Sequence, residues 1–344
     1  MQEQPILQTH SPAMRSSLNS PSASVSVVIP TRNRPRMVFA AVRSALEQTH
    51  PPHEVIVVID GPENSPEAVP GEQGTAETLA VIDDPRLRVL ALPASRGGGA
   101  ARNLGVQMAT GDWIAFLDDD DLWLPPKLAA QLAFAGTLAP GSTPVLSCPV
   151  LARSPQWEEV WPREPYRPGE PMAEYLFCRR GWRYGSALLQ TSTLLAPRNL
   201  LLRIPFTPGL RKHQDWDWLL RVAADSHVSI YSVGPAPLAV FHVEGDRPSV
   251  GRARNWRFSF EWAREREQFF TPRAFSGFLA TECAAQAQGE SWSERVALLR
   301  AFVRTGPPSL VELARLAVFL LVPQNTRRAI RDRWRLRSQA TPLH

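Results

Sequence analysis

The segment from Gly111 to Trp123, GDWIAFLDDDDLW, constrains the fold of this chain most, because an apolar run ends there in four consecutive aspartates. Residues 113–117 are too few and too continuously apolar for an exposed helix, so they predict a buried strand. Four adjacent carboxylates need a compensating cation, since two unit charges about 4 Å apart repel by roughly 4 kcal/mol near a protein surface. A divalent metal held by oxygen ligands is one interpretation. A solvated acidic turn that caps a helix near Pro125 is the other, and the segment alone favours neither.

Upstream of this segment, short β-branched strands alternate with helical stretches. Strands are predicted at 25–30, 54–59 and 88–92, and helices at 35–48, 75–82 and 100–109. The alternation is typical of an α/β fold with a mostly parallel sheet flanked by helices, in which ligands bind beyond the carboxyl ends of the strands. Asp60 and Asp118 each follow such a strand, so we expect them at the same edge of the sheet. That expectation favours the metal interpretation over the capping one.

Downstream, the pattern continues with four more strands and two helices. The strands are predicted at 145–150, 185–195, 228–233 and 238–243, and the helices at 125–135 and 213–225. Residues 157–171, rich in Pro, Trp and Glu, predict an irregular loop that is either a functional lid or a surface excursion. Asp215 lies at the start of the 213–225 helix, where an aspartate is more often an N-cap than a catalytic base. His242 ends an apolar strand and is either structural or a ligand of a divalent metal.

Three regions are predicted along the chain. Residues 1–23 lack a long apolar core and predict a disordered leader, residues 24–250 the α/β domain, and residues 251–344 a C-terminal helical extension with a basic tail. Helices are expected in this extension at 256–270, 293–303 and 310–322. The last is too short to span a hydrocarbon core, which needs about 20 residues. Arginines follow it, so an in-plane anchor on an anionic membrane and a core helix with a solvated tail are equally good interpretations.

Charge and cysteine content narrow the partners and the compartment. The net charge of +5 comes mainly from the arginine-rich C-terminal third and suggests an anionic partner. The interleaved aromatic and glycine patterns of RNA-binding modules are missing, so no nucleic acid partner is expected. Cys148, Cys178 and Cys283 lie far apart without a CxxC pair, which is typical of a reducing cytoplasm. We expect a cytoplasmic protein, peripheral at the inner membrane face if the anchor interpretation holds.

Four segments in order resemble motifs of the inverting glycosyltransferases of family 2, which have the Rossmann-like GT-A fold. VSVVIPTRNRP resembles the first strand of that family, EVIVVIDGP the second, RGGGAARNLGVQMATGDWIAFLDDDDLW the third helix with the DXD strand, and HQDWDWLLRVA the acceptor-side helix. The resemblance covers about residues 24–243. It implies an enzyme that uses a nucleotide-sugar as donor and Mn2+ or Mg2+ as a divalent metal cofactor.

The resemblance also assigns residues to the donor side. It implies that Asp60 recognises the nucleotide base, with Pro30, Thr31 and Arg32 lining the same pocket. Arg102 and Asn103 are implied as a further nucleotide-binding pair.

The aspartate cluster aligns with the DXD motif. The resemblance places Asp118 near ribose and metal, and Asp120 on the metal. Asp119, the variable middle position, belongs with the donor-binding residues. Asp121 supports them or caps the next helix. His242 would complete the metal shell or contact a phosphate.

Asp215 aligns with the aspartate of the ED signature, which implies the general base, although Gln214 stands where the family has glutamate. The chemistry needs both parts: a cation neutralises the leaving phosphates, and a base deprotonates the acceptor hydroxyl. A single base opposite the leaving group gives inversion at the anomeric carbon. The second strand ends in IDGP rather than DDGS, a departure that concerns the nucleotide contacts near Pro62. No QxxRW motif follows the Asp215 helix, and no flanking transmembrane helices are predicted. We therefore expect one sugar per saccharide or lipid-linked acceptor of the cell envelope or a polysaccharide, not processive synthesis.

Two other classes of function remain as alternatives. A nucleotidyltransferase that makes nucleotide sugars would need a glycine-rich loop after the first strand, whereas residues 30–35 contain no glycine. A catalytically inactive GT-A-like binding module would not need the aspartates at 118, 120 and 215.

Overall fold

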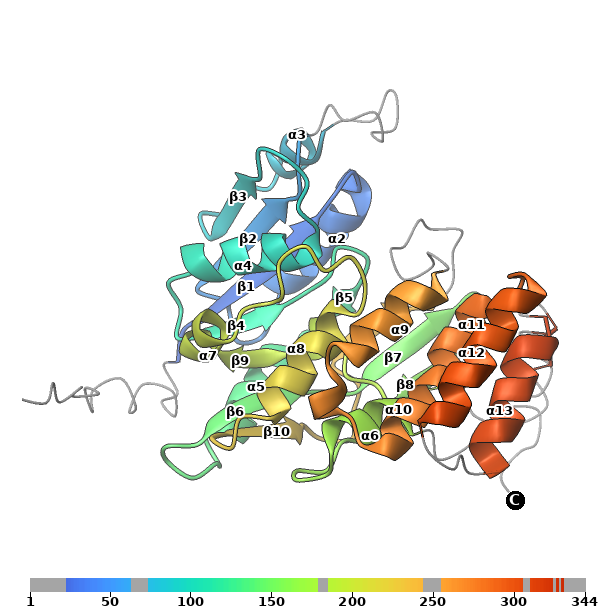
Figure 1. Ribbon diagram of the computed structural model, residues 1–344. Coiled ribbons are helices and arrows are strands. Elements are labelled where there is room, and N and C mark those ends of the chain that lie inside the picture. Colours follow the sequence, from blue (N-terminus) through green and yellow to red (C-terminus); the bar gives the residue numbers. More distant parts are fainter. Residues whose placement is uncertain are drawn as a thin grey trace, which may run out of the picture.

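A computed structural model describes residues 23–62, 74–178, 185–243, 255–305, 310–323, 326–327 and 329–330 of the chain. The described residues form a seven-stranded sheet, a four-stranded sheet and a group of C-terminal helices (Figure 1). Residues 1–22 of the expected leader, the expected boundary at 250 and the arginines at 331–337 lie outside the described residues.

The larger sheet has the strand order β10-β6-β9-β4-β1-β2-β3. Its strands are β1 (Val25–Thr31), β2 (Glu54–Ile59), β3 (Leu87–Ala91), β4 (Trp113–Phe116), β6 (Thr143–Ser147), β9 (Leu195–Pro197) and β10 (Val228–Ser232). Neighbouring strands are parallel, except that β9 runs antiparallel to β4 and β6. The prediction of a mostly parallel sheet is confirmed.

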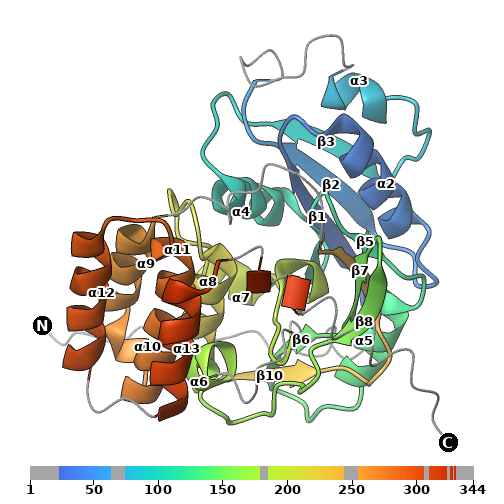
Figure 2. The same cartoon turned by 90° about the vertical axis from the view of Figure 1, so that its right-hand side faces the viewer.

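The strands β1, β2 and β4 are covered on both faces. Every residue of β1, β2 and β4 is buried. Val28 faces a core that includes Ala101 of α4 (Gly98–Met108), whereas Val27 faces a core that includes Val42 of α2 (Pro35–Leu46). Figure 2 shows α2 and α4 on opposite sides of β1 and β2. Strands covered on both faces require continuous apolar runs, which is why the sequence revealed them.

Glu54, at the start of β2, provides a pH-dependent contribution to stability. Burial would raise its pKa, but hydrogen bonds from Thr110, Ser26 and Arg88 outweigh burial and lower the pKa from 4.5 to about 2. A lowered pKa in the folded state stabilises the fold above pH 4.5, and this contribution is lost as the pH falls from 4.5 towards 2.

We therefore expect Glu54→Gln to lower the free energy of unfolding by up to about 3 kcal/mol at neutral pH, with the difference from wild type shrinking below pH 4.5. Urea unfolding at several pH values would measure both effects. Glu47→Gln is the matched control, because Glu47 forms an exposed ion pair with Arg43, which is worth less than about 1 kcal/mol. A pH-independent loss in Glu54→Gln would contradict the assignment.

A second sheet with the order β5-β11-β7-β8 corrects two predictions. Its strands are β5 (Leu122–Trp123), β7 (Val150–Ser154), β8 (Trp157–Trp161) and β11 (Ala239–His242). Residues 145–150 are not one strand, because β6 ends at Ser147 and β7 begins in the other sheet at Val150. Residues 157–161 are a strand and not part of an irregular loop. Their alternation explains this, since Trp157 and Trp161 are buried while Glu158 is exposed.

The predicted strand at 185–195 is also wrong. Thr191–Thr193 form a 3-10 turn, and only Leu195–Pro197 form a strand, β9. The Thr193 hydroxyl donates to the Gln190 carbonyl oxygen at 2.6 Å. Such side-chain bonds to nearby backbone compete with strand pairing, which favours a turn here.

Six of the remaining helices lie where helices were predicted: α3 (Thr75–Leu79), α5 (Lys127–Ala135), α8 (Gln214–Ala223), α9 (Trp256–Arg264), α12 (Trp292–Arg304) and α13 (Leu310–Leu321). Four further short helices were not predicted: α6 (Met172–Phe177), α7 (Arg198–Arg203), α10 (Pro272–Phe278) and α11 (Ala284–Ala287). α9 ends at Arg264, short of the predicted 270, and a 3-10 turn (Glu267–Phe269) follows it. α4 begins at Gly98, earlier than predicted.

The C-terminal helices share a core with the larger sheet. Phe278 and Phe302 belong to the same buried cluster as Phe116 of β4 and Trp218 of α8. Among the described residues, no helix has the length and apolarity needed to cross a membrane.

Candidate active site

The carboxyl ends of β1, β2 and β4 lie at one edge of the larger sheet, because these strands are parallel and adjacent. Thr31 ends β1, Asp60 follows β2, and Asp118 follows β4. The structure therefore brings Asp60 and Asp118 to the same edge, as expected. In parallel sheets this edge is where ligands bind.

The four aspartates do not act as one cluster. The Asp121 backbone N–H donates to the Asp118 carbonyl oxygen at 3.1 Å and closes a turn. The Asp119 side chain accepts hydrogen bonds from the Thr31 hydroxyl at 2.8 Å and from Arg34 Nη1 at 2.9 Å. Burial raises the pKa of Asp119 to about 6 despite the opposing charge of Arg34. The Asp119 carboxylate therefore joins the turn to the end of β1.

Asp121 is turned into the protein. Its carboxylate accepts hydrogen bonds from the Ser192 hydroxyl at 2.6 Å and from the Gln190 amide. Burial and the charges of Asp120 and Asp118 raise the pKa of Asp121 well above its ordinary value. The helix-capping interpretation is wrong for this residue, because the N-cap of α5 is Pro126 and no side chain caps that helix.

Asp118 and Asp120 are the two aspartates that reach the surface. Their side chains are 24% and 31% exposed, compared with 8% for Asp119. Arg102 forms an ion pair with Asp118, and Arg34 Nη1 lies 3.2 Å from an oxygen of Asp120. These two arginines therefore offset part of the repulsion between the adjacent aspartate carboxylates.

Asp215 lies near Asp118, and the positive charge of Arg102 acts on both carboxylates. It is the second residue of α8, and the helix N-cap is His213, which has the left-handed φ of 65°. The N-cap interpretation of Asp215 is therefore wrong. Burial raises the pKa of Asp215, the charge of Asp118 adds to this effect, and the charge of Arg102 and the backbone N–H of Thr191 oppose it. A half-buried carboxylate with a raised pKa is suited to accept a proton near neutral pH.

Gln214 replaces the expected glutamate without disrupting the local geometry. Its side-chain oxygen accepts a hydrogen bond from Arg102 at 2.9 Å, and its nitrogen donates to the Leu210 carbonyl oxygen at 2.6 Å. A neutral side chain here leaves the charge of Arg102 directed at Asp118 and Asp215.

The turn Thr191–Thr193 connects Asp215 with Asp118 and Asp121, and the sequence did not predict this turn. Thr191 faces Asp215. The Ser192 hydroxyl accepts the Asp118 N–H at 3.0 Å while donating to Asp121. Thr193 points into the core, where its hydroxyl lies 2.9 Å from that of Ser147. Three successive polar side chains were the only sequence signal.

Trp123 and Lys127 support this turn from behind. The Trp123 indole N–H donates to the Ser192 carbonyl oxygen at 2.8 Å, and the buried Lys127 ammonium lies 4.0 Å from the centre of the Trp123 ring. Gln131 accepts a hydrogen bond from Lys127 at 2.7 Å and donates to the Thr193 carbonyl oxygen at 2.8 Å. Burial lowers the pKa of Lys127 to about 8.

We expect Ser192→Ala to lower the free energy of unfolding by about 1–3 kcal/mol, because the buried Asp121 loses a hydrogen-bond donor. The Asp118 N–H loses its acceptor as well, which adds to the loss. Thermal unfolding would measure the effect. Ser142→Ala, which removes an exposed hydroxyl, is the matched control. Equal stability of Ser192→Ala and the control would contradict a supporting role for this hydroxyl.

In the pocket that is predicted to bind the nucleotide base, the contacts centre on Asp60. Its carboxylate accepts hydrogen bonds from the Ser95 hydroxyl at 2.9 Å and from the Arg96 and Gly97 backbone N–H groups at 2.7 and 2.9 Å. Arg32 lies 3.9 Å from the same carboxylate and also contacts Ser95. These contacts hold Asp60 at the start of α4.

Two predicted nucleotide-side residues have structural contacts. Pro30 is buried within β1. The Asn103 amide donates to the Phe206 carbonyl oxygen at 2.8 Å and accepts the Phe206 N–H at 2.9 Å. Asn103 therefore fixes the segment before α8 to α4.

His242 lies beside the aspartate turn. Its Nδ1 is 3.1 Å from the carbonyl oxygen of Asp120. A metal-binding histidine usually donates its other ring N–H to a carbonyl or carboxylate, so this contact is compatible with a ligand role for Nε2.

The residues at this edge fit a divalent cation that is shared with a diphosphate. Among the described residues, no group of three or more His, Cys, Asp or Glu side chains is arranged to hold a metal alone. Asp118 and Asp120 offer two exposed carboxylates. Mg2+ is commonly held by one or two carboxylates together with substrate phosphates, which matches this donor set.

Comparisons with known proteins agree with this geometry. The sequence model described as "Glycosyl transferase family 2" matches residues 26–188, a segment that contains Asp60, Arg102 and the aspartate turn. The amylovoran biosynthesis glycosyltransferase AmsB of Erwinia amylovora is 29% identical over 255 residues, covering 73% of this chain and 80% of AmsB. Escherichia coli WfgD, named as a UDP-Glc:alpha-D-GlcNAc-diphosphoundecaprenol beta-1,3-glucosyltransferase, is 30% identical over 109 residues, covering 32% of this chain and 40% of WfgD.

The fold is also found in a solved structure. The crystal structure of residues 1–349 of TarS from S. aureus in complex with UDP-GlcNAc aligns with a TM-score of 0.55 and 16% identity, covering 90% of this chain and 88% of that chain. The likeness supports the GT-A fold and extends beyond the segment matched by the family.

Proposed function

Because the chain belongs to glycosyl transferase family 2, we propose that it moves one sugar from a nucleotide-sugar donor to an acceptor hydroxyl, with inversion at the anomeric carbon. One observation carries the proposal. Arg102 lies between the DXD-type carboxylate Asp118 and the candidate base Asp215, so residues of the donor and acceptor sides meet at one edge of the sheet.

The donor side of the proposal uses residues at the ends of β1, β2 and β4. Asp60 and Arg32 contact the nucleotide base. Asp118 and Asp120 face the diphosphate, where they and His242 would hold Mn2+ or Mg2+. When bound, the metal would neutralise charge on the leaving phosphates. Asp119 and Asp121 position the two exposed aspartates through their contacts with Thr31, Arg34 and Ser192.

The acceptor side uses Asp215. Its carboxylate takes the proton of the acceptor hydroxyl as that oxygen bonds to the anomeric carbon. The bond from this carbon to the diphosphate oxygen breaks, and the nucleoside diphosphate leaves with the electron pair. Arg102 keeps a positive charge beside Asp215 and Asp118, which limits how far burial raises the pKa of the base.

The acceptor is proposed to be a saccharide of the cell envelope or of a secreted polysaccharide, carried on a lipid at the inner membrane face. The names of AmsB and WfgD support this class, since they refer to amylovoran biosynthesis and to a diphosphoundecaprenol-linked acceptor. Membrane association of the C-terminal region would place the enzyme beside such an acceptor.

Mass spectrometry and NMR of the product test this function. The protein would be incubated with Mn2+, a panel of nucleotide-sugars and lipid-linked saccharide acceptors. We expect an acceptor mass increased by one sugar and an anomeric configuration opposite to that of the donor. A ladder of longer products would contradict single transfer, and a retained configuration would contradict a single-base mechanism.

A further inference from the structure

α12 carries an apolar stripe on its outer face as well as on its inner face. Leu298 and Phe302 are buried in the core, whereas Trp292 is 71% and Val303 64% exposed. Val296 and Leu299 complete the exposed stripe at a spacing of three or four residues, which places all four on one side of the helix. Such a continuous exposed apolar face marks an interaction site rather than scattered surface residues.

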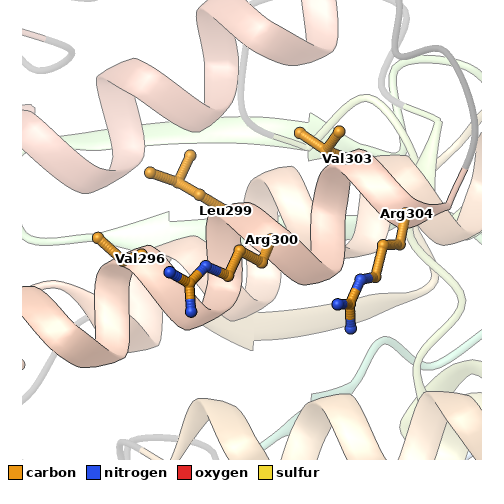
Figure 3. Close-up of a pocket in the computed structure, with 5 residues that line it drawn as sticks. All are labelled: Val296, Leu299, Arg300, Val303 and Arg304. Carbon is orange, nitrogen blue, oxygen red and sulfur yellow. The ribbon is translucent and has the colours of Figure 1, made fainter.

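The stripe forms one side of a shallow pocket whose other lining residues are basic. Val296, Leu299 and Val303 line the pocket together with Arg300 and Arg304. Figure 3 shows the side chains of Arg300 and Arg304 extending to one side of the helix, with Leu299 and Val303 on the other side. Arg300 and Arg304 are exposed, and neither guanidinium forms an ion pair or hydrogen bond with another described residue.

α13 also exposes apolar side chains. Its inner side buries Leu316 and Leu320, but Leu310 is 84% and Leu321 64% exposed. Both helices lie at the outer side of the helical group, away from β1–β3 (Figures 1 and 2). The core-helix interpretation of this segment thus accounts for one of its faces only.

Charge indicates which partner fits. Residues 292–344 contain ten arginines and only three acidic residues, Glu294, Glu312 and Asp332. Glu294 is already paired with Arg257. An isologous dimer through this face would bring arginines against arginines, so a second copy is a poor occupant.

We propose that the outer face of α12 docks onto an anionic lipid surface. Val296, Leu299 and Val303 enter the boundary between headgroups and acyl chains, while Arg300 and Arg304 pair with lipid phosphates. Docking of α12 deepens the proposed function. It rests on that function only in one respect, namely that the acceptor is carried on a membrane. It moves the principal contact from α13 to α12 and leaves the transfer chemistry unaffected.

Vesicle sedimentation of the full-length protein tests the proposal. Vesicles of phosphatidylglycerol with phosphatidylcholine would be compared with vesicles of phosphatidylcholine alone, at low and high salt. One double variant combines Val303→Ser with Arg304→Gln, and a second combines Leu299→Ser with Arg300→Gln. The matched control combines Val81→Ser with Arg43→Gln, which changes an exposed valine and an exposed arginine far from α12. Thermal unfolding would verify that all three remain folded.

We expect wild type and the control to bind anionic vesicles in a salt-dependent manner. Each α12 variant should bind at least about fivefold more weakly, because one arginine near an anionic surface contributes about that factor. Equal binding of the α12 variants and the control would overturn the proposal. So would wild-type protein that fails to bind anionic vesicles, that binds neutral vesicles equally well, or that binds nucleic acid instead of vesicles. Transfer to a soluble acceptor, measured in parallel, should be unchanged in the α12 variants, so loss of docking is distinguishable from loss of the proposed function.

Discussion

Asp215→Asn is expected to lower kcat by about 10²–10⁴-fold, the range that a general base contributes. The asparagine has nearly the same shape but cannot accept the proton of the acceptor hydroxyl. Donor affinity should change little, because Asp215 acts on the acceptor side. Turnover and nucleotide binding, measured on the same preparation, would separate the two effects.

The pH dependence supplies a second readout for Asp215. The base must be deprotonated, and burial raises its pKa. Wild-type kcat/KM should therefore fall as the pH decreases through that raised pKa. Asp225→Asn, just beyond the other end of α8, is the matched control and should keep wild-type turnover. Near-normal turnover of Asp215→Asn would assign the base to another residue.

Asp120→Ala is expected to lower metal-stimulated turnover by about 10²–10³-fold, because charge on the leaving diphosphate loses its stabilisation. Stability should stay the same or rise. The charge of Asp120 raises the pKa of both Asp119 and Asp121, so its removal relieves repulsion. Loss of activity without loss of stability would distinguish a metal-binding role from a structural one.

Metal titration and thermal unfolding of Asp120→Ala would measure these two outcomes. Asp84→Ala is the control for removal of a surface aspartate, since among the described residues the Asp84 carboxylate pairs only with the nearby Arg86. Equal turnover of wild type in Mn2+ and in excess EDTA would contradict the metal assignment for Asp118, Asp120 and His242.

Much of the donor side could be predicted from the sequence, because its residues follow buried strands. β1, β2 and β4 are covered on both faces and therefore appear as continuous apolar runs, so their ends mark Thr31, Asp60 and Asp118 without tertiary information. The helical spacing of α8 likewise placed Asp215 near its start.

The partners of these residues could not be predicted, because they come from distant segments. Ser192 lies far along the chain from Asp118 and Asp121, yet its hydroxyl contacts both. The charge of the adjacent aspartates is offset by Arg34, from the loop before α2, and by Arg102, from α4. Only tertiary packing determines these contacts.

The most direct measurement is nucleoside diphosphate release across a panel of nucleotide-sugars, with acceptor present, for wild type, Asp120→Ala and Asp215→Asn. We expect wild type to turn over at least one donor in Mn2+, to stop in EDTA, and to exceed both variants by at least about 100-fold. Nucleotide binding without turnover of any donor, or wild-type rates in both variants, would contradict sugar transfer at the Asp118–Asp215 edge of the sheet.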